Sequence, residues 1–151
     1  MALAPGEAAP DFTLFATPDQ KISLSELDQP VVLIFYPADW SPVCGDELTM
    51  FEAANRMFRE RGAQLLGISV DGVWSHQAFR TEHKIDFPLL SDFHPKGEVA
   101  RSYGVYRDED GVCERALFVI DREQKVAWSY VSPIGVNPGA DGALRAVEAL
   151  S

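Results

Sequence analysis

Cys44 has the sequence surroundings of a reactive thiol. It follows the apolar stretch 31–36 and the segment 37–43, which contains two prolines, and it precedes a long helical pattern. A helix N-terminus carries about half a positive charge and unpaired N–H groups, which stabilise a thiolate. The thiolate is the nucleophilic form, whereas a free cysteine with a reference pKa of ~8.5 is only ~3% ionised at pH 7. The position of Cys44 therefore predicts nucleophilic sulfur chemistry, although many cysteines simply pack as small hydrophobic residues.

The apolar pattern predicts strands that alternate with helices around this cysteine. Strands are expected at 31–36, 63–70, 87–90 and 116–120, with hairpins at 11–24 and 116–131. Helices are expected at 44–61, 73–83, 96–103 and 140–150. The first helix is expected to place Met50, Phe51, Ala54, Met57 and Phe58 on one face. This order predicts an α/β fold with a mixed central sheet flanked by helices and an N-terminal β-hairpin, in one domain over residues 1–151.

Composition excludes several classes of protein. The 151 residues carry a net charge of −10, which disfavours nucleic acid and anionic membranes as partners. No apolar run approaches 18 residues, and the first residues lack the basic and apolar pattern of a secretory leader, so we expect a cytoplasmic protein. Two cysteines without a CxxC motif are too few for a disulfide scaffold and disfavour dithiol exchange.

Several motifs of the sequence resemble those of the peroxiredoxins. The family pattern Pro-x-x-x-Thr/Ser-x-x-Cys is matched by Pro37, Ser41 and Cys44, and an arginine that begins a late strand is matched by Arg115. The segments Ala-Pro-Asp-Phe-Thr-Leu, Phe-Pro-Leu-Leu-Ser-Asp and Tyr-Gly-Val extend the resemblance over nearly the whole chain. It implies a thioredoxin-like fold and a thiol-dependent peroxidase without a cofactor. Hydrogen peroxide and small organic hydroperoxides would be reduced through a cysteine sulfenic acid.

Within the family the chain is most similar to the E-type alkyl hydroperoxide reductases, which are often one-cysteine enzymes. The Q-type, or bacterioferritin comigratory, group is the near alternative. Many Q-type members carry a resolving cysteine five residues after the reactive one, and here that position is Thr49. That form of the Q-type mechanism is therefore not expected.

The resemblance implies catalytic roles for four residues. Cys44 is the nucleophile, and Arg115 stabilises the thiolate and donates directed hydrogen bonds. The hydroxyl of Ser41 is expected to bind the peroxide, and the N–H groups of Val43 and Cys44 to bind the departing oxygen. Pro37 fixes the loop and shields the sulfur from water. Taken singly, Arg115 could equally be a surface ion-pair residue, Ser41 a turn or helix-cap residue and Pro37 a strand terminator.

Other residues have two open readings each. Glu47, one turn after Cys44, either orients Arg115 or favours the helix N-terminus. Trp40 either forms an apolar rim for organic hydroperoxides or packs at a subunit contact. The three histidines, His76, His83 and His94, have no metal-ligand spacing with the cysteines; we expect ordinary surface or partly buried residues and no metal.

Cys113 is a candidate resolving cysteine. If residues 113–115 are extended and Arg115 points at Cys44, Cys113 lies toward the same side, since residues two apart on a strand share a face. We nevertheless expect a one-cysteine mechanism, in which an external thiol reduces the sulfenate of Cys44. The reductant would be a thioredoxin-, glutaredoxin- or mycoredoxin-like protein or a low-molecular-weight thiol, and the resemblance also implies a homodimer. An alternative function is a peroxide sensor or thiol relay that signals through oxidised Cys44 to a partner.

Overall fold

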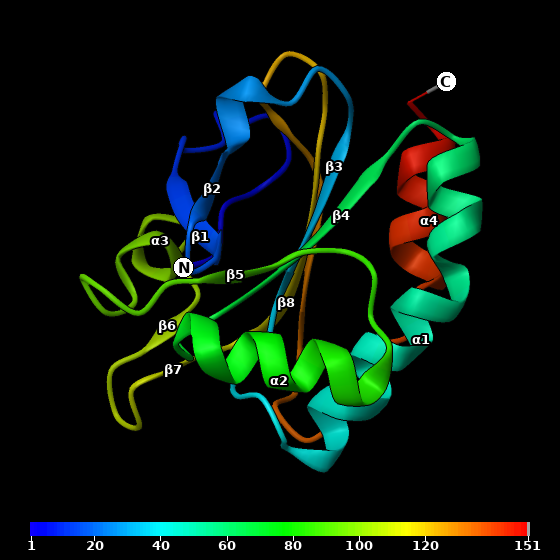
Figure 1. The fold of residues 1–151 in the computed structure, drawn as a ribbon. Helices are drawn as coiled ribbons and strands as arrows, with labels where there is room; N and C mark the ends of the chain where they lie inside the picture. Colours follow the sequence, from blue (N-terminus) through cyan, green and yellow to red (C-terminus); the bar gives the residue numbers. More distant parts are fainter. Residues whose placement is uncertain (151) are drawn as a thin grey trace.

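A seven-stranded mixed sheet forms the centre of the computed structural model, which describes residues 1–150 (Figure 1). Its strand order is β2-β1-β5-β4-β3-β8-β9. These strands are β1 (Thr13–Thr17), β2 (Gln20–Ser23), β3 (Val31–Phe35), β4 (Gln64–Ser69), β5 (Leu89–Ser91), β8 (Arg115–Ile120) and β9 (Val126–Ser132). The N-terminal hairpin, the late β8–β9 hairpin and the mixed sheet confirm the predicted fold class.

The central strands are apolar along their whole length because helices or loops cover both faces of the sheet. Every residue of β3 and of β8 is buried. β3 pairs in parallel with β4 and antiparallel with β8, with Phe35 opposite Ala116 at the end of β3. The end of β3 therefore lies beside the beginning of β8.

Two hydrophobic cores lie on opposite faces of the sheet. The helices α1 (Pro42–Glu60), α2 (Val73–His83) and α4 (Asp141–Glu148) pack on one face, where α1 and α4 run side by side (Figure 1). The other face is covered by the N-terminal segment, α3 (Glu98–Ser102) and the 3-10 helix η1 (Leu24–Glu26). We call these the α1 face and the α3 face.

The helix α1 begins earlier and is turned differently than the sequence predicts. Pro42 is its first residue, so Cys44 lies within the first turn rather than at the opening position. Phe51, Ala54 and Phe58 are buried as expected, but Met50 and Met57 are 46% and 42% exposed. The buried face of α1 instead includes Cys44, Glu47 and Leu48. Apolar periodicity alone does not predict this face, because one of its buried residues is a glutamate.

A small hairpin of β6 (Tyr106–Arg107) and β7 (Val112–Cys113) is not among the elements predicted from the sequence.

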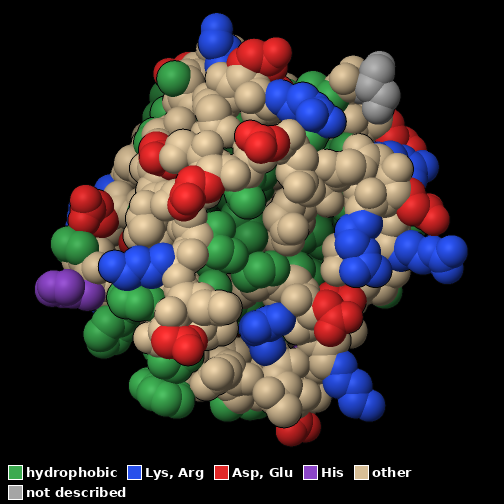
Figure 2. Space-filling view, turned by 45° about the horizontal axis from the view of Figure 1, so that its top comes forward, with side chains coloured by type: hydrophobic (Ala, Val, Ile, Leu, Met, Phe, Trp, Pro, Cys, Tyr) green, Lys and Arg blue, Asp and Glu red, His purple; other side chains and the backbone are tan. Residues whose placement is uncertain are grey.

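Acidic and basic side chains are interspersed over the face in Figure 2, around a central strip of hydrophobic side chains. The net charge of −10 is thus not gathered into one acidic patch on this face. Among residues 1–150, no helix is both long and apolar enough to cross a membrane.

The orientation of α1 can be tested with two neighbouring residues. Phe58 is fully buried and Met57 is 42% exposed. Phe58→Ala should lower the free energy of unfolding by about 3–5 kcal/mol because it leaves a cavity. Met57→Ala should lower it by less than about 1 kcal/mol. Urea unfolding of both variants measures this, and similar losses in the two would contradict the orientation described here.

Candidate active site

Strand pairing places the start of β8 next to the loop that follows β3. Phe35 is opposite Ala116, so Arg115 lies beside the point where the chain leaves the sheet toward α1. Residues 37–41 form this loop, which we call the active-site loop, and Pro42 then begins α1. Two distant parts of the sequence therefore meet where the central strand β3 ends and β8 begins, on the α1 face.

The guanidinium of Arg115 joins Cys44 to Glu47. Its Nη1 lies 3.4 Å from Cys44 Sγ and 2.9 Å from Glu47 Oε1. Its Nε donates to the carbonyl oxygen of Ile134 at 2.8 Å. Arg115 is only 2% exposed, and Cys44 and Glu47 are fully buried. Because these groups are shielded from water, the interaction of the guanidinium with a negative sulfur is stronger than it would be on the surface.

Glu47 is the acidic group of the site. Burial raises the pKa of Glu47 from 4.5 to about 7, although the hydrogen bond and charge of Arg115 act in the opposite direction. Among the buried side-chain polar atoms of residues 1–150, Oε2 of Glu47 has no hydrogen-bond partner. Glu47 therefore orients Arg115 through one oxygen, and near neutral pH it is present in both protonation states.

The first turn of α1 offers backbone donors near the sulfur. The first hydrogen bond of the helix runs from the N–H of Gly45 to the carbonyl oxygen of Ser41 at 2.9 Å. The N–H groups of Val43 and Cys44 come before this bond, at the open end of the helix. Ser41 makes no side-chain hydrogen bond to the helix end. The open N–H groups and the helix dipole favour negative charge at this position.

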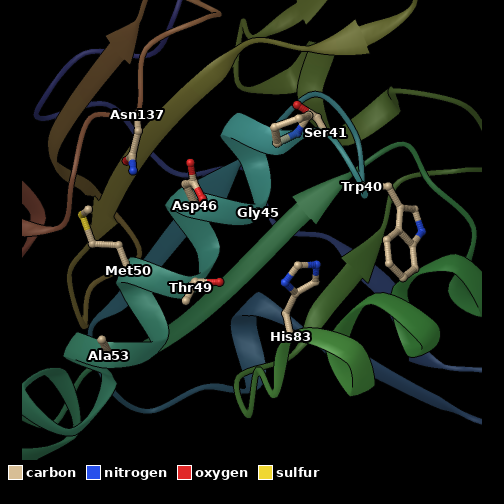
Figure 3. A pocket seen from close by; sticks show the side chains of 10 residues that line it. Trp40, Ser41, Gly45, Asp46, Thr49, Met50, Ala53, His83 and Asn137 are labelled. Atoms are coloured by element: carbon tan, nitrogen blue, oxygen red, sulfur yellow. The ribbon is translucent and has the colours of Figure 1, made fainter.

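The active-site loop borders a groove on the outer side of α1 (Figure 3). The groove has a volume of about 610 Å³, and its wall includes Trp40 and Ser41 from the loop, Thr49 from α1 and His83 from the end of α2. Trp40 is 52% exposed and packs edge-on against Phe79 of α2, with ring centroids 5.2 Å apart. Cys44 does not line the groove. A peroxide therefore reaches the sulfur only when side chains or backbone at the loop move.

Pro37 and Ser41 are both half-buried and lie at the two ends of the active-site loop, so the structure places them on the same short segment as Cys44. For Ser41 the hydroxyl makes no hydrogen bond to Cys44 or Arg115 within residues 1–150. The four predicted catalytic residues thus lie close together where β3 ends and β8 begins. The hydroxyl of Ser41 is not hydrogen-bonded to either of the other polar groups of this site.

Cys113 lies on the other face of the sheet. It belongs to the core of the α3 face, whereas Cys44 belongs to the core of the α1 face. The expectation that Cys113 shares a side with Arg115 is wrong because the strand is interrupted at Glu114, between β7 and β8. Both thiols are free and buried, and burial raises the pKa of Cys113. The sheet therefore stands between the two cysteines.

His76 is not the surface or partly buried residue that the sequence suggests. It is fully buried and forms a polar network with Tyr36 and Asp39, which the sequence analysis missed. The sequence does not predict this pairing, because Asp39 and His76 are far apart in the chain and belong to a loop and a helix. Asp39 lies in the middle of the active-site loop.

Glu47 predicts a particular dependence of stability on pH. The folded chain keeps the proton of Glu47 up to about pH 7, whereas an unfolded glutamate loses it near pH 4.5. Between these values the folded state binds more protons, so the free energy of unfolding falls as pH rises. Glu47→Gln should reduce this fall between pH 5 and pH 8 by at most about 3 kcal/mol, since one pKa unit is worth about 1.4 kcal/mol.

Urea unfolding at both pH values measures the effect. Glu60→Gln is the matched control, because Glu60 lies on the same helix with a side chain that is 57% exposed. It should lose as much stability as the unmodified chain over this pH range. The same loss in Glu47→Gln would show that Glu47 ionises normally in the folded state.

Known proteins share both the sequence and the fold of this chain. It is 40% identical to the 2-cysteine peroxiredoxin, chloroplastic, of Chattonella marina var. antiqua, over 99% of this chain and 82% of that protein. The structure of peroxidoxin BcpB from Mycobacterium tuberculosis is 35% identical, with a TM-score of 0.88 and 99% of each chain covered. Mycobacterium tuberculosis AhpC is 28% identical with a TM-score of 0.87, over 99% of this chain and 94% of that one.

The family model described as the AhpC/TSA family matches residues 5–129. This match covers most of the chain, including the active-site loop, α1 and Arg115. Together with the relatives it shows a peroxiredoxin, so the expected thiol-dependent peroxidase function and thioredoxin-like fold are confirmed. The chain belongs to the AhpC/TSA family of peroxiredoxins.

Proposed function

We propose that Cys44 is the peroxidatic cysteine of a one-cysteine peroxidase that reduces hydrogen peroxide and small organic hydroperoxides. The observation that carries this proposal is the contact of Arg115 Nη1 with both Cys44 Sγ, at 3.4 Å, and Glu47 Oε1, at 2.9 Å. A buried guanidinium beside a cysteine in the first turn of a helix favours the thiolate, which is the form that attacks.

The reaction is a displacement at oxygen. The Cys44 thiolate attacks one peroxide oxygen, an S–O bond forms, and the O–O bond breaks. The departing oxygen takes a proton and leaves as water or an alcohol, and Cys44 becomes a sulfenic acid. An external thiol then displaces water to give a mixed disulfide, and a second thiol releases Cys44 as a thiol.

The geometry supports a role for each motif residue. Arg115 presents a planar set of donors to the sulfur and to the attacked oxygen. The N–H groups of Val43 and Cys44 at the start of α1 stabilise the negative charge that develops on the oxygens. The free hydroxyl of Ser41 is available to donate to the peroxide, and Pro37 and Pro42 limit the conformations of the loop between them.

Resolution by an external thiol is favoured over resolution by Cys113. Cys113 lies in the core of the α3 face, across the sheet from Cys44. A disulfide needs Cα atoms within about 7 Å and side chains that face each other, whereas the two thiols are buried in separate cores, so pairing would require the backbone to move. Thr49, at the position of the Q-type resolving cysteine, lines the groove beside the active-site loop and has no thiol.

The finer assignment to the E-type subgroup rests on the same features. Several relatives are named 2-Cys peroxiredoxins, and the similar Mycobacterium tuberculosis structure is named BcpB. The one-cysteine E-type assignment for this chain is favoured by the absence of a second cysteine on the α1 face within residues 1–150. A redoxin-like protein or a low-molecular-weight thiol is the proposed reductant, and a cytoplasmic location remains a prediction from sequence.

The roles of Cys44 and Arg115 can be tested by the rate of oxidation with hydrogen peroxide in stopped flow. Cys44→Ser should abolish the reaction. Arg115→Ala should slow it by at least about 100-fold, because a buried charged donor is lost. Arg115→Lys should also slow it strongly, since lysine keeps the charge but loses the planar arrangement of donors.

Arg107→Lys is the matched control for these variants. Arg107 also binds carboxylates, those of Asp110 and Glu114, but it lies on the β6–β7 hairpin. Its rate should equal that of the unmodified chain. Unchanged oxidation in Arg115→Ala would refute the proposed role of this arginine.

A homodimer with its contact near the active-site loop is proposed from the family resemblance and from the exposure of Trp40, which is 52%. Trp40→Glu should convert the dimer to a monomer in sedimentation experiments. Tyr130→Glu is the comparison variant, because Tyr130 is similarly exposed, at 45%, but lies on the edge strand β9. A dimer that survives Trp40→Glu and dissociates with Tyr130→Glu would place the contact at the sheet edge instead.

A further inference from the structure

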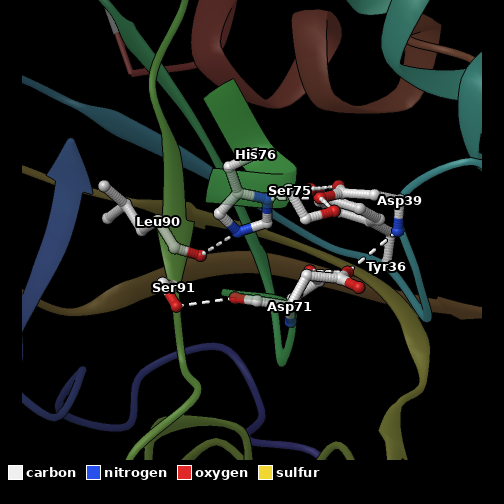
Figure 4. A network of polar contacts seen from close by, with 8 residues as sticks. Tyr36, Asp39, Asp71, Ser75, His76, Leu90 and Ser91 are labelled. Atoms are coloured by element: carbon white, nitrogen blue, oxygen red, sulfur yellow. Dashed lines mark hydrogen bonds and ion pairs between the residues drawn. The ribbon is translucent and has the colours of Figure 1, made fainter. Parts of the chain in front are cut away.

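Asp39 ties the middle of the active-site loop to the protein interior (Figure 4). It is 6% exposed, and its carboxylate accepts hydrogen bonds from the hydroxyls of Tyr36, at 2.7 Å, and Ser75, at 2.8 Å. Its Oδ2 also lies 2.8 Å from Nδ1 of His76. The loop is thereby connected to the end of β3 and to the first turn of α2.

The neighbours of His76 determine where its protons lie. Nε2 is 3.0 Å from the carbonyl oxygen of Leu90, which can only accept, so Nε2 carries a proton. Burial alone would raise the pKa of Asp39, but the hydrogen bond and charge of His76 hold it below its ordinary value. The 2.8 Å contact joins Nδ1 of the His76 imidazole to Oδ2 of the Asp39 carboxylate. Both side chains of this pair are fully buried.

The backbone of the loop has a second attachment at the same residue. The N–H of Asp39 donates to Oδ2 of Asp71 at 2.8 Å, and the hydroxyl of Ser69 donates to that same oxygen. The carbonyl of Asp71 accepts from the hydroxyl of Ser91 at 2.6 Å. Asp71 follows β4 and Ser91 ends β5, so the loop is fixed to two neighbouring strands of the sheet.

The charged and titratable groups that face the pair are few. They are the carboxylates of Asp39 and Asp71, the imidazole of His76 and the phenol of Tyr36. Burial raises the pKa of Tyr36 well above its ordinary value, so the phenol stays neutral and donates. Both oxygens of the Asp39 carboxylate are in contact with polar groups of the protein, Oδ1 with Tyr36 and Oδ2 with Ser75 and His76.

The residue after Asp39 shows why the loop needs such attachments. Trp40 has φ = 71°, in the left-handed region that a bulky residue rarely adopts. This conformation is strained and persists only where the surroundings enforce it. Trp40 is followed directly by Ser41 and by the first turn of α1, which contains Cys44. A loop released from Asp39 would relax at Trp40 and displace the residues that align the peroxide.

We propose that Asp39 and His76 are positioning residues for the peroxidase reaction. Their buried 2.8 Å contact holds the active-site loop in the conformation that sets Ser41 and the start of α1 against Arg115 and the bound peroxide. Neither residue contacts Cys44, so their effect is on the alignment of the oxygens and not on the sulfur itself. The inference rests on the proposed function of Cys44.

The test compares two reactions of the same thiol. Oxidation by hydrogen peroxide needs an aligned O–O bond, whereas alkylation by iodoacetamide needs only an accessible thiolate. Asp39→Ala should lower the ratio of the oxidation rate to the alkylation rate by about tenfold or more. His76→Gln should lower it similarly. The double variant should lower it no further than the larger single effect, because both residues act through the one contact between them.

Asp92→Ala is the matched control. Asp92 is 1% exposed and accepts hydrogen bonds from the N–H groups of Val99 and Ala100 on the α3 face, away from the active-site loop. It should lower the free energy of unfolding but leave the ratio of rates unchanged. If Asp39→Ala does not fold, Ser75→Ala removes a single hydrogen bond from the same carboxylate, and its ratio should fall by a smaller factor in the same direction.

The outcomes separate the two proposals. If the unmodified protein is oxidised by peroxide no faster than a free thiol, the proposed role of Cys44 fails. If the unmodified protein reacts rapidly but every folded variant of Asp39, Ser75 and His76 keeps its ratio of rates, only the positioning role is overturned. A lower ratio in the variants of this network and an unchanged ratio in Asp92→Ala support the inference.

Discussion

The buried guanidinium of Arg115 is the group on which the rest of the site depends. A charge removed from water is tolerated only when its hydrogen-bonding groups find partners. Arg115 finds them in Glu47, the carbonyl of Ile134 and Cys44, at 2.9, 2.8 and 3.4 Å. These partners come from α1 and from the segment after β9. The hydrogen bonds of one cation therefore connect α1, with Cys44, to the start of β8 and to the segment after β9. Because Glu47 carries its proton for part of the time near neutral pH, the charge of Arg115 is not fully cancelled by its carboxylate.

The sheet divides the molecule into a reactive face and a structural face. Cys44, Arg115 and Glu47 lie on the α1 face, together with the ends of α1 and α2 that shape the groove. Cys113 lies among the side chains that pack under α3. The same thiol group is therefore placed in two settings: one beside a guanidinium at a helix start, and one in an apolar core where burial raises the pKa of the thiol. This contrast supports the proposal that Cys44 is the reactive cysteine and Cys113 is not.

Much of the fold could be predicted from sequence because it depends on local patterns. The continuous apolar run of β3 and the bounds of α2 are of this kind, and the motif spacing identified the loop, Cys44 and Arg115. Features that depend on contacts between distant residues could not be predicted. The strand is interrupted at Glu114, and Cys113 faces the other core. In α1 Glu47 faces inward, whereas Met50 and Met57 face outward. The contact of Asp39 with His76 joins a loop to a helix, and no sequence motif links the two residues.

The claim that Cys44 alone reacts, beside Arg115 and across the sheet from Cys113, is tested most directly by mass spectrometry. The reduced protein would be treated with one equivalent of hydrogen peroxide, trapped with a reagent for sulfenic acids, and mapped by peptide. The account predicts that the trapped sulfenic acid is found on Cys44 and that Cys113 remains a free thiol. Rapid and stoichiometric formation of a disulfide between Cys44 and Cys113, within one chain or between two, would contradict it.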